Sequence, residues 1–292
     1  MLVSAFAKLN LSLEILGKRS DGYHEVRTVM QTVDLCDEVE VLPASQLTVT
    51  CDSPELDGES NLAWKAALNL ARHCGRLPLA SVSIRKHIPV GMGLGGGSSD
   101  AAAVLVALNR LWKLALPLSE LAEIGEGLGS DVPFFLWGGA AVASGRGEII
   151  EPLPAKSGAA VTLICPNASL EAKTSRMYSR LMPYHYSDGG VTLRLVQDMI
   201  GGYYGDGLFT NAFENVAFAE FDSLTKVFNV VESACGRKPH LTGAGPGLFL
   251  LPSSREEHSR ISEALPPDLA RAYFVRTLGR HSETNPAIRL EA

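Results

Sequence analysis

The segment PVGMGLGGGSSDAA spans residues 89–102 and places five glycines within the seven positions 91–97. Glycine tolerates positive φ and carries no side chain, so the backbone N–H groups of such a loop can converge on an anion. A helix that begins where the loop ends adds N-terminal amides, which favour phosphate. No Lys-Ser or Lys-Thr pair follows the glycines, and the features of a dinucleotide fingerprint are missing. The segment therefore predicts a phosphate-binding loop of another class, with a flexible linker as the alternative.

Periodic segments surround this loop. Apolar residues recur at helical spacing over 61–74 and over 100–113, which predicts two helices. The residues suited to N-cap these helices are Asn61 for the first and Ser98, Ser99 or Asp100 for the second. Strands are predicted near 26–34, 38–42, 46–50, 81–88 and 161–166.

The segment from Lys8 to Ile15 alternates polar and apolar residues. A period of two predicts a half-buried strand with Lys8 and Asn10 on one face. The polar face of such a strand is usually solvated, and this is the alternative to a functional role for the two residues.

The segment EPLPAKSG at 151–158 interrupts the periodic pattern and is predicted to separate two domains, 1–153 and 154–292. Helical spacing follows near 174–182, 191–199 and 214–234, and a glycine-rich turn leads into an apolar strand at 240–251. Strands and helices mix without strict βαβ alternation, which favours the α+β class.

Composition limits the function classes. The formal net charge is -6, and no run of Lys or Arg exceeds two residues, so nucleic acid is not an expected partner. The start of the chain does not resemble a signal peptide, and no apolar stretch is long enough for a membrane span, so we expect a cytoplasmic protein without a membrane partner. The five cysteines are scattered, which predicts free thiols.

Two further turns contain residues suited to chemistry. LGSDVPFF at 128–135 places Asp131 between a Gly-Ser turn and a proline, where an aspartate is either a local Asx cap or a functional carboxylate. LTGAGPG at 241–247 is either an ordinary turn or a second site where backbone amides meet a ligand.

In this order and spacing, the three segments resemble the signatures of the GHMP kinase superfamily. Within it, AKLNLSLEILGKRSDGYH at 7–24 and the long glycine run GLGGGSSDAA are similar to the 4-diphosphocytidyl-2-C-methyl-D-erythritol kinase family, while KTSRMYSRL and LTGAGPGLF carry a weaker likeness in the second half. The resemblance implies an ATP-dependent kinase of isoprenoid precursor synthesis that phosphorylates the 2-hydroxyl of this substrate. It also implies a two-domain fold, with a ribosomal-protein-like N-terminal domain and a ferredoxin-like C-terminal domain.

The resemblance also implies roles for single residues. Lys8 and Asp131 match the family positions that face the reacting hydroxyl, where a carboxylate can accept a proton and a cation can offset developing charge. The implied substrate ligands are Asn10, Tyr23, His24 at the cytosine edge, Tyr178 stacked on the base, and the backbone N–H groups of Gly243 and Gly245. The alternative for Tyr178 is a tyrosine of the core.

ATP and Mg²⁺ are the implied cofactors. The implied ATP ligands are Pro89, Gly91, Gly93, Leu94, Gly95, Gly96, Gly97, Ser98 and Ser99, with Asn61 and Lys86 nearer the nucleoside. Ser99 is also a candidate oxygen ligand for Mg²⁺. The protein is expected to be a monomer or a weak homodimer.

Three positions depart from the family pattern. Met30 stands where an aromatic residue is common, and Ala244 and Gly247 replace residues that are often Ser or Thr.

The remaining alternatives are another GHMP kinase, acting on mevalonate, homoserine or a sugar, and a catalytically silent nucleotide-binding regulator. An intact Lys8–Asp131 pair argues against the regulator.

Overall fold

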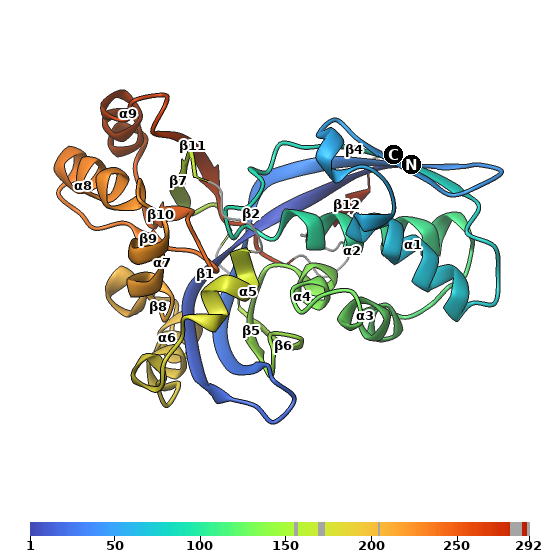
Figure 1. The fold of residues 1–292 in the computed structure, drawn as a ribbon, viewed down its shortest axis with the longest axis horizontal. Coiled ribbons are helices and arrows are strands. Elements are labelled where there is room, and N and C mark those ends of the chain that lie inside the picture. Colours follow the sequence, from blue (N-terminus) through green and yellow to red (C-terminus); the bar gives the residue numbers. More distant parts are fainter. Residues whose placement is uncertain (155–156, 169–172, 204, 281–287, 291–292) are drawn as a thin grey trace.

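The computed structural model describes residues 1–154, 157–168, 173–203, 205–280 and 288–290. Two sheets, each associated with helices, make a mixed architecture, and the α+β class predicted from the sequence is confirmed (Figure 1). Within these residues no helix combines the length and the apolar character that a bilayer crossing needs. All five cysteines are free, as predicted.

The larger sheet is built around a long N-terminal hairpin. Its strands are β1 (Leu2–Lys18), β2 (His24–Pro43), β3 (Thr48–Cys51), β4 (Ala80–Arg85), β5 (Ala140–Ser144), β6 (Ile149–Leu153), β8 (Thr210–Asn211) and β12 (Ile288–Leu290). The order β12-β1-β2-β4-β3 forms the main path; β5 and β6 extend from β2, and β8 pairs with β1. The segments 26–34 and 38–42, predicted as two strands, are parts of the single strand β2.

Helices of the N-terminal half lie beside this sheet (Figure 1). They are α1 (Leu62–His73), α2 (Gly96–Leu111), α3 (Leu118–Glu126) and α4 (Val132–Trp137), with short 3-10 turns η1 (Pro54–Leu56) and η2 (Gly58–Ser60). Asn61 caps α1 as predicted, because its side chain accepts a hydrogen bond from the backbone N–H of Ala63 at 2.8 Å.

The start of α2 corrects the sequence prediction. Gly95 is the N-cap residue, in the left-handed conformation with φ 74°, and no side chain caps this end. Ser98, Ser99 and Asp100 therefore lie inside the helix rather than at its cap. The physical reason is the conformational freedom of glycine, which lets the loop enter the helix directly.

Strand β1 is buried on both faces, although its alternating pattern predicts one solvated face. Leu9 and Leu11 pack in a cluster with Leu163 and Phe249 of the C-terminal half. The polar residues of the other face are also enclosed, because α2 and the loop that precedes it (residues 89–95, the glycine loop) cover this side. Lys8 and Asn10 are each only 3% exposed.

The C-terminal half contains a four-stranded antiparallel sheet in the order β11-β7-β10-β9. Its strands are β7 (Ala160–Pro166), β9 (His240–Leu241), β10 (Leu248–Leu250) and β11 (Ala270–Arg276). Its helices are α5 (Lys173–Ser179), α6 (Gly190–Ile200), α7 (Glu214–Glu220), α8 (Leu224–Cys235) and α9 (Arg255–Ala264), with 3-10 turns η3 (Pro183–His185) and η4 (Asp206–Leu208). The predicted helix 214–234 is two helices, because Phe221 is extended between them.

The two halves share strands. β8 pairs in parallel with β1 at Ser12 and Leu13, and β12 pairs with β1 at Val3, Ser4 and Ala5. Both strands come after residue 153 in the sequence. The domain boundary at 153/154 stays a prediction. The chain therefore returns to the N-terminal sheet twice after leaving it.

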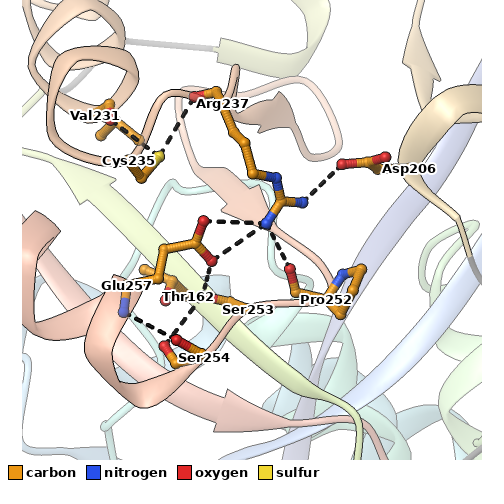
Figure 2. Close-up of polar contacts among 9 residues, drawn as sticks. All are labelled: Thr162, Asp206, Val231, Cys235, Arg237, Pro252, Ser253, Ser254 and Glu257. Atoms are coloured by element: carbon orange, nitrogen blue, oxygen red, sulfur yellow. Dashed lines mark hydrogen bonds and ion pairs between the residues drawn. The ribbon is translucent and has the colours of Figure 1, made fainter.

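A network of hydrogen bonds around Arg237 links several segments of the C-terminal half (Figure 2). Its guanidinium donates to the carboxylates of Glu257, at 3.1 and 3.2 Å, and Asp206, at 2.7 Å, and to the carbonyl of Pro252 at 2.8 Å. The network joins the end of α8 to η4 and to α9, three elements that are separate in the sequence.

Candidate active site

A cavity of ≈ 1110 Å³ is lined by residues of both halves. Its wall is formed by the glycine loop, the polar face of β1, the turn that precedes α4, the helix α5, and part of the turn at 241–247. The residues predicted from the sequence that line it are Lys8, Asn10, Tyr23, His24, Asn61, Lys86, Pro89, Gly91, Gly93, Leu94, Gly95, Gly96, Gly97, Ser98, Asp131, Tyr178 and Gly243.

The glycine loop is shaped by close packing as well as by backbone conformation. Gly93 and Gly95 have positive φ angles of 80° and 74°. A Cβ atom at Gly95 would lie 2.6 Å from the Phe135 ring, and one at Gly93 would lie 2.4 Å from the carbonyl oxygen of Thr242. The Leu94 carbonyl accepts a hydrogen bond from the backbone N–H of Lys8 at 3.0 Å, which holds the loop against β1.

Ser99 and Ser98 have different surroundings. Ser99 is fully buried, and its hydroxyl donates to the carbonyl of Phe6 at 2.8 Å, so it serves the core and not the cavity. Ser98 lines the cavity. The prediction of Ser99 as an ATP and Mg²⁺ ligand is therefore corrected, since helical geometry turns adjacent side chains in different directions.

A buried ionic cluster lies under the loop. The Lys86 ammonium donates to Asp37 at 2.5 Å and to Asp100 at 2.7 Å. Burial raises the pKa of the Asp100 carboxyl, against the lowering effect of the Lys86 charge. Because Lys86 is held by two carboxylates at the cavity wall, its charge is largely offset before a ligand enters.

Lys8 and Asp131 meet at the cavity wall. The Lys8 ammonium lies 3.3 Å from Asp131 Oδ2 and donates to Asn10 Oδ1 at 2.5 Å. The Asp131 side chain is 34% exposed and makes no N-cap hydrogen bond to α4, which removes the Asx-cap alternative. A carboxylate with this partner can accept a proton from a hydroxyl, and the ammonium can offset charge on a phosphoryl group.

Local irregularity in the hairpin positions these groups. The register of β1 against β2 shifts between Phe6 and Lys8 and again between Asn10 and Ser12. Such bulges re-aim side chains and are common beside active sites. Asn10 is fixed by its own hydrogen bonds to the Thr28 hydroxyl, at 2.8 Å, and to the Thr242 hydroxyl, at 2.9 Å.

Aromatic rings gather at another part of the cavity. The rings of His24 and Tyr178 lie 5.2 Å apart between centroids, and Tyr178 also packs edge-on against Phe213 at 4.9 Å. Burial lowers the pKa of His24, which favours the neutral ring. Tyr178 thus combines the two possibilities that the sequence left open, because it packs on the core and also lines the cavity.

Tyr23 lies at the rim of the cavity and is 54% exposed. The Arg146 guanidinium lies over its ring, 5.0 Å from the centroid, and also lines the cavity. Met30 is buried, faces the same cavity and leaves one wall without an aromatic ring. The sequence pattern gave no reason to single out Arg146, since its position beside Tyr23 depends on the packing of β5 and β6 beside β2.

The turn at 241–247 contributes less than predicted. Gly243 and Ala244 line the cavity, but Gly245 does not, and its N–H donates to the Thr242 carbonyl at 3.0 Å. The prediction that the Gly245 amide faces a ligand is therefore corrected, because the turn itself uses that donor. The carbonyl of Gly245 instead accepts a hydrogen bond from Lys173 at 2.5 Å.

Lys173 is a cavity residue that the sequence reasoning missed. It begins the segment KTSRMYSRL, which resembles the family but shows no local pattern that singles out Lys173. Burial lowers its pKa to about 8, aided by the nearby Lys8 charge and opposed by Asp131. A lone lysine carries no periodic signal, so only the fold could show that it faces this cavity.

Comparison with known proteins agrees with this geometry. The family described as GHMP kinases N terminal domain matches residues 61–139. A 4-diphosphocytidyl-2-C-methyl-D-erythritol kinase of Dehalococcoides mccartyi is 39% identical over 94% of this chain and 96% of its own length. A protein of the same name from Geobacillus is 39% identical over 97% of this chain and 99% of its own.

Solved structures extend the likeness to the whole fold. A crystal structure of 4-(cytidine 5'-diphospho)-2C-methyl-D-erythritol kinase matches with a TM-score of 0.80 and 31% identity, over 96% of this chain and 100% of that chain. A homoserine kinase from Cytophaga hutchinsonii matches with a TM-score of 0.75 at 17% identity, over 99% of this chain and 96% of that chain, and so shares the fold. The chain has the two-domain GHMP kinase fold and belongs to the 4-diphosphocytidyl-2-C-methyl-D-erythritol kinase family of small-molecule kinases.

Proposed function

We propose that this chain transfers the γ-phosphate of ATP to the 2-hydroxyl of 4-diphosphocytidyl-2-C-methyl-D-erythritol. The observation that carries the proposal is the Lys8–Asp131 pair, 3.3 Å apart in a cavity that also contains the glycine loop. Family membership at 39% identity over nearly the whole chain supports the choice of substrate.

Different residues of the cavity suit different parts of the proposed reaction. The glycine loop and the start of α2 offer backbone N–H groups to the ATP phosphates. Asp131 orients the acceptor hydroxyl and takes its proton, while Lys8 offsets charge on the phosphoryl group in transfer. His24 and Tyr178 present a polar edge and an aromatic face, which suit a planar base such as cytosine.

Mg²⁺ fits this arrangement as a companion of ATP. Among the described residues, no group of three His, Cys, Asp or Glu side chains forms a dedicated metal cage. Mg²⁺ bound to ATP takes most of its oxygens from phosphate and water, and Ser98 and Asp131 supply oxygen atoms at the cavity wall. When bound, the ion would neutralise phosphate charge; Ser98, rather than Ser99, is the hydroxyl that we place near it.

An ADP-release assay with Mg-ATP tests the proposal. The panel contains the diphosphocytidyl substrate, mevalonate, homoserine and galactose, with ATP alone as the background. Turnover of the diphosphocytidyl compound alone is expected. Turnover of another acceptor would retain the kinase site but remove the cytosine assignment. Binding of ATP with no turnover on any acceptor would favour the silent regulator.

A further inference from the structure

Lys173 has a cationic side chain that is not accounted for by the proposed chemistry. It is the first residue of α5, is half-buried, and lines the same cavity as Lys8 and Asp131. Its ammonium donates to a neutral acceptor, the carbonyl of Gly245, at 2.5 Å. Among the described residues, no carboxylate lies within ion-pair distance of it.

The absence of a described carboxylate partner sets Lys173 apart from Lys8 and Lys86, while Lys18, the fourth lysine of the cavity, is exposed to solvent. Lys8 pairs with Asp131, and Lys86 is held by Asp37 and Asp100. Removing an ammonium from water is costly unless an anion or several acceptors compensate. Burial and the Lys8 charge accordingly lower the pKa of Lys173 to about 8. A ligand anion would supply the missing charge.

The position of Lys173 indicates which anion this is. Its hydrogen bond holds it at the turn 241–247, where Ala244 lines the cavity without a hydroxyl and the Gly245 amide is used within the turn. The glycine loop, where we place the ATP phosphates, touches this turn through Gly93, but Lys173 is held by a carbonyl of the turn and not by the loop. The compound named for the related crystal structure carries a cytidine diphosphate, whose phosphates are anionic.

We propose that the Lys173 ammonium binds an oxygen of the diphosphate of the acceptor substrate and makes the site selective for a diphosphate-bearing acceptor. This inference rests on the proposed function. Lys173 takes over the part that a hydroxyl group at position 244 would otherwise play, since Ala244 lines the cavity. A cation holds a phosphate oxygen by a charge-assisted hydrogen bond, which is stronger than a bond from a neutral hydroxyl.

Binding of two probes tests the assignment without requiring turnover. Titration calorimetry compares CDP with cytidine on the wild-type protein, on Lys173→Met and on Lys173→Arg. We expect Lys173→Met to lose about 10- to 100-fold in CDP affinity and to bind cytidine unchanged, while Lys173→Arg retains most of the CDP affinity. Equal loss for both probes, or no loss for CDP, would overturn the proposal.

Steady-state kinetics supply the second readout. With the diphosphocytidyl substrate, Lys173→Met should raise KM and leave kcat and the KM for ATP close to wild type. A fall in kcat with unchanged KM would instead place Lys173 in the chemical step and refute the binding role. Lys226→Met, at an exposed lysine of α8, is the matched control. Thermal melts exclude misfolding of the variants.

The pH profile adds a signature that a structural role would not produce. A lysine with a pKa of about 8 in the free enzyme loses its proton as the pH rises through that value. Wild-type kcat/KM for the acceptor should therefore fall above this pH, and the fall should vanish in Lys173→Met and move to higher pH in Lys173→Arg. An identical fall in all three proteins would contradict the proposal. Absence of turnover by the wild type, with CDP still bound through Lys173, would refute only the proposed kinase activity.

Discussion

At the scale of single residues, the site depends on the different surroundings of similar side chains. Lys8, Lys86 and Lys173 all line the cavity, but one pairs with Asp131, one is held by two aspartates, and one donates to a carbonyl. The two neighbouring serines also differ in their surroundings, because Ser99 is buried in the core and Ser98 lines the cavity. Residue type alone therefore does not assign a role in this cavity.

Replacement of the proposed proton acceptor tests the reaction at this scale. Asp131→Asn keeps the size of the side chain but removes its basicity, so we expect kcat to fall about 10²- to 10⁴-fold with ATP binding retained. Single-turnover kinetics and ATP titration measure the two quantities separately. Asp222→Asn, at an exposed aspartate outside the cavity, is the control. A kcat near the wild-type value would remove Asp131 from the proposed role.

At the scale of elements, glycine positions determine how the glycine loop enters α2. A side chain at Gly95 meets both a positive φ of 74° and the Phe135 ring at 2.6 Å. A side chain at Gly97 meets only Leu62 at 3.9 Å, inside the helix. The two glycines thus differ in what their substitution would disturb, although both line the cavity.

These two positions give a matched pair of variants. Gly95→Ala should lower the free energy of unfolding by about 2–4 kcal/mol, through backbone strain and overpacking, and should weaken ATP binding as the loop shifts. Gly97→Ala should leave the free energy of unfolding within about 1 kcal/mol of wild type or raise it, because alanine favours helix. Urea unfolding and ATP titration of both variants make the comparison. Equal stabilities would show that the loop tolerates a side chain at Gly95.

The Arg237 network is the corresponding element-scale feature of the C-terminal half (Figure 2). Arg237→Met removes bonds to Glu257 and Asp206 and leaves the largely buried Glu257 carboxylate without this partner. We expect a loss of about 2 kcal/mol in the free energy of unfolding, with kcat unchanged, because the network does not line the cavity. Arg72→Met, at an exposed arginine of α1, is the control.

The same variant carries a pH signature. The hydrogen bond from Arg237 holds the pKa of Asp206 below its usual value. A carboxyl whose pKa is lowered by folding contributes stability above its unfolded pKa, near 4, and loses that contribution as the pH falls through the folded pKa. The stability difference between wild type and Arg237→Met should therefore shrink in acid. A constant difference across this range would show that Asp206 is not coupled to Arg237.

At the scale of the whole molecule, the two halves meet backbone to backbone beside the cavity. The N–H of Gly247 donates to the Met92 carbonyl at 3.2 Å, and a Cβ atom at Gly247 would lie 2.4 Å from that oxygen. Gly93 and Gly243 also approach each other closely, since a Cβ atom at Gly243 would lie 2.8 Å from the Gly93 carbonyl oxygen. Packing therefore accounts for the glycine at 247, because the glycine loop occupies the space that a side chain would need.

Gly247→Ser tests this contact between the halves. Although Ser or Thr is common at this position in the family pattern, here the side chain should force the turn away from the glycine loop. We expect a loss of about 1–3 kcal/mol in the free energy of unfolding and a higher KM for both ATP and acceptor. Gly207→Ala, where a Cβ atom meets nothing within 4 Å, is the control. Wild-type stability and KM values in Gly247→Ser would show that the contact is adaptable.

Local pattern was enough to predict much of this protein. Glycine spacing predicted a loop that leads into a helix, helical spacing predicted α1 with its Asn61 cap, and the three motifs pointed to the family. These predictions held because conformational freedom, capping and periodicity depend on residues close together in the chain. Seventeen of the nineteen predicted site residues line the cavity, and the two that do not, Ser99 and Gly245, had their donors satisfied by neighbouring backbone.

Only the tertiary structure decided what covers each surface. The alternating pattern of β1 could not reveal that its polar face is enclosed, because the residues that enclose it come from α2 and the glycine loop. Lys173 and Arg146 carry no local signal, and they reach the cavity through packing between distant segments. Burial, ion pairing and the resulting pKa values are properties of assembled surfaces, so they depend on contacts that a one-dimensional pattern does not contain.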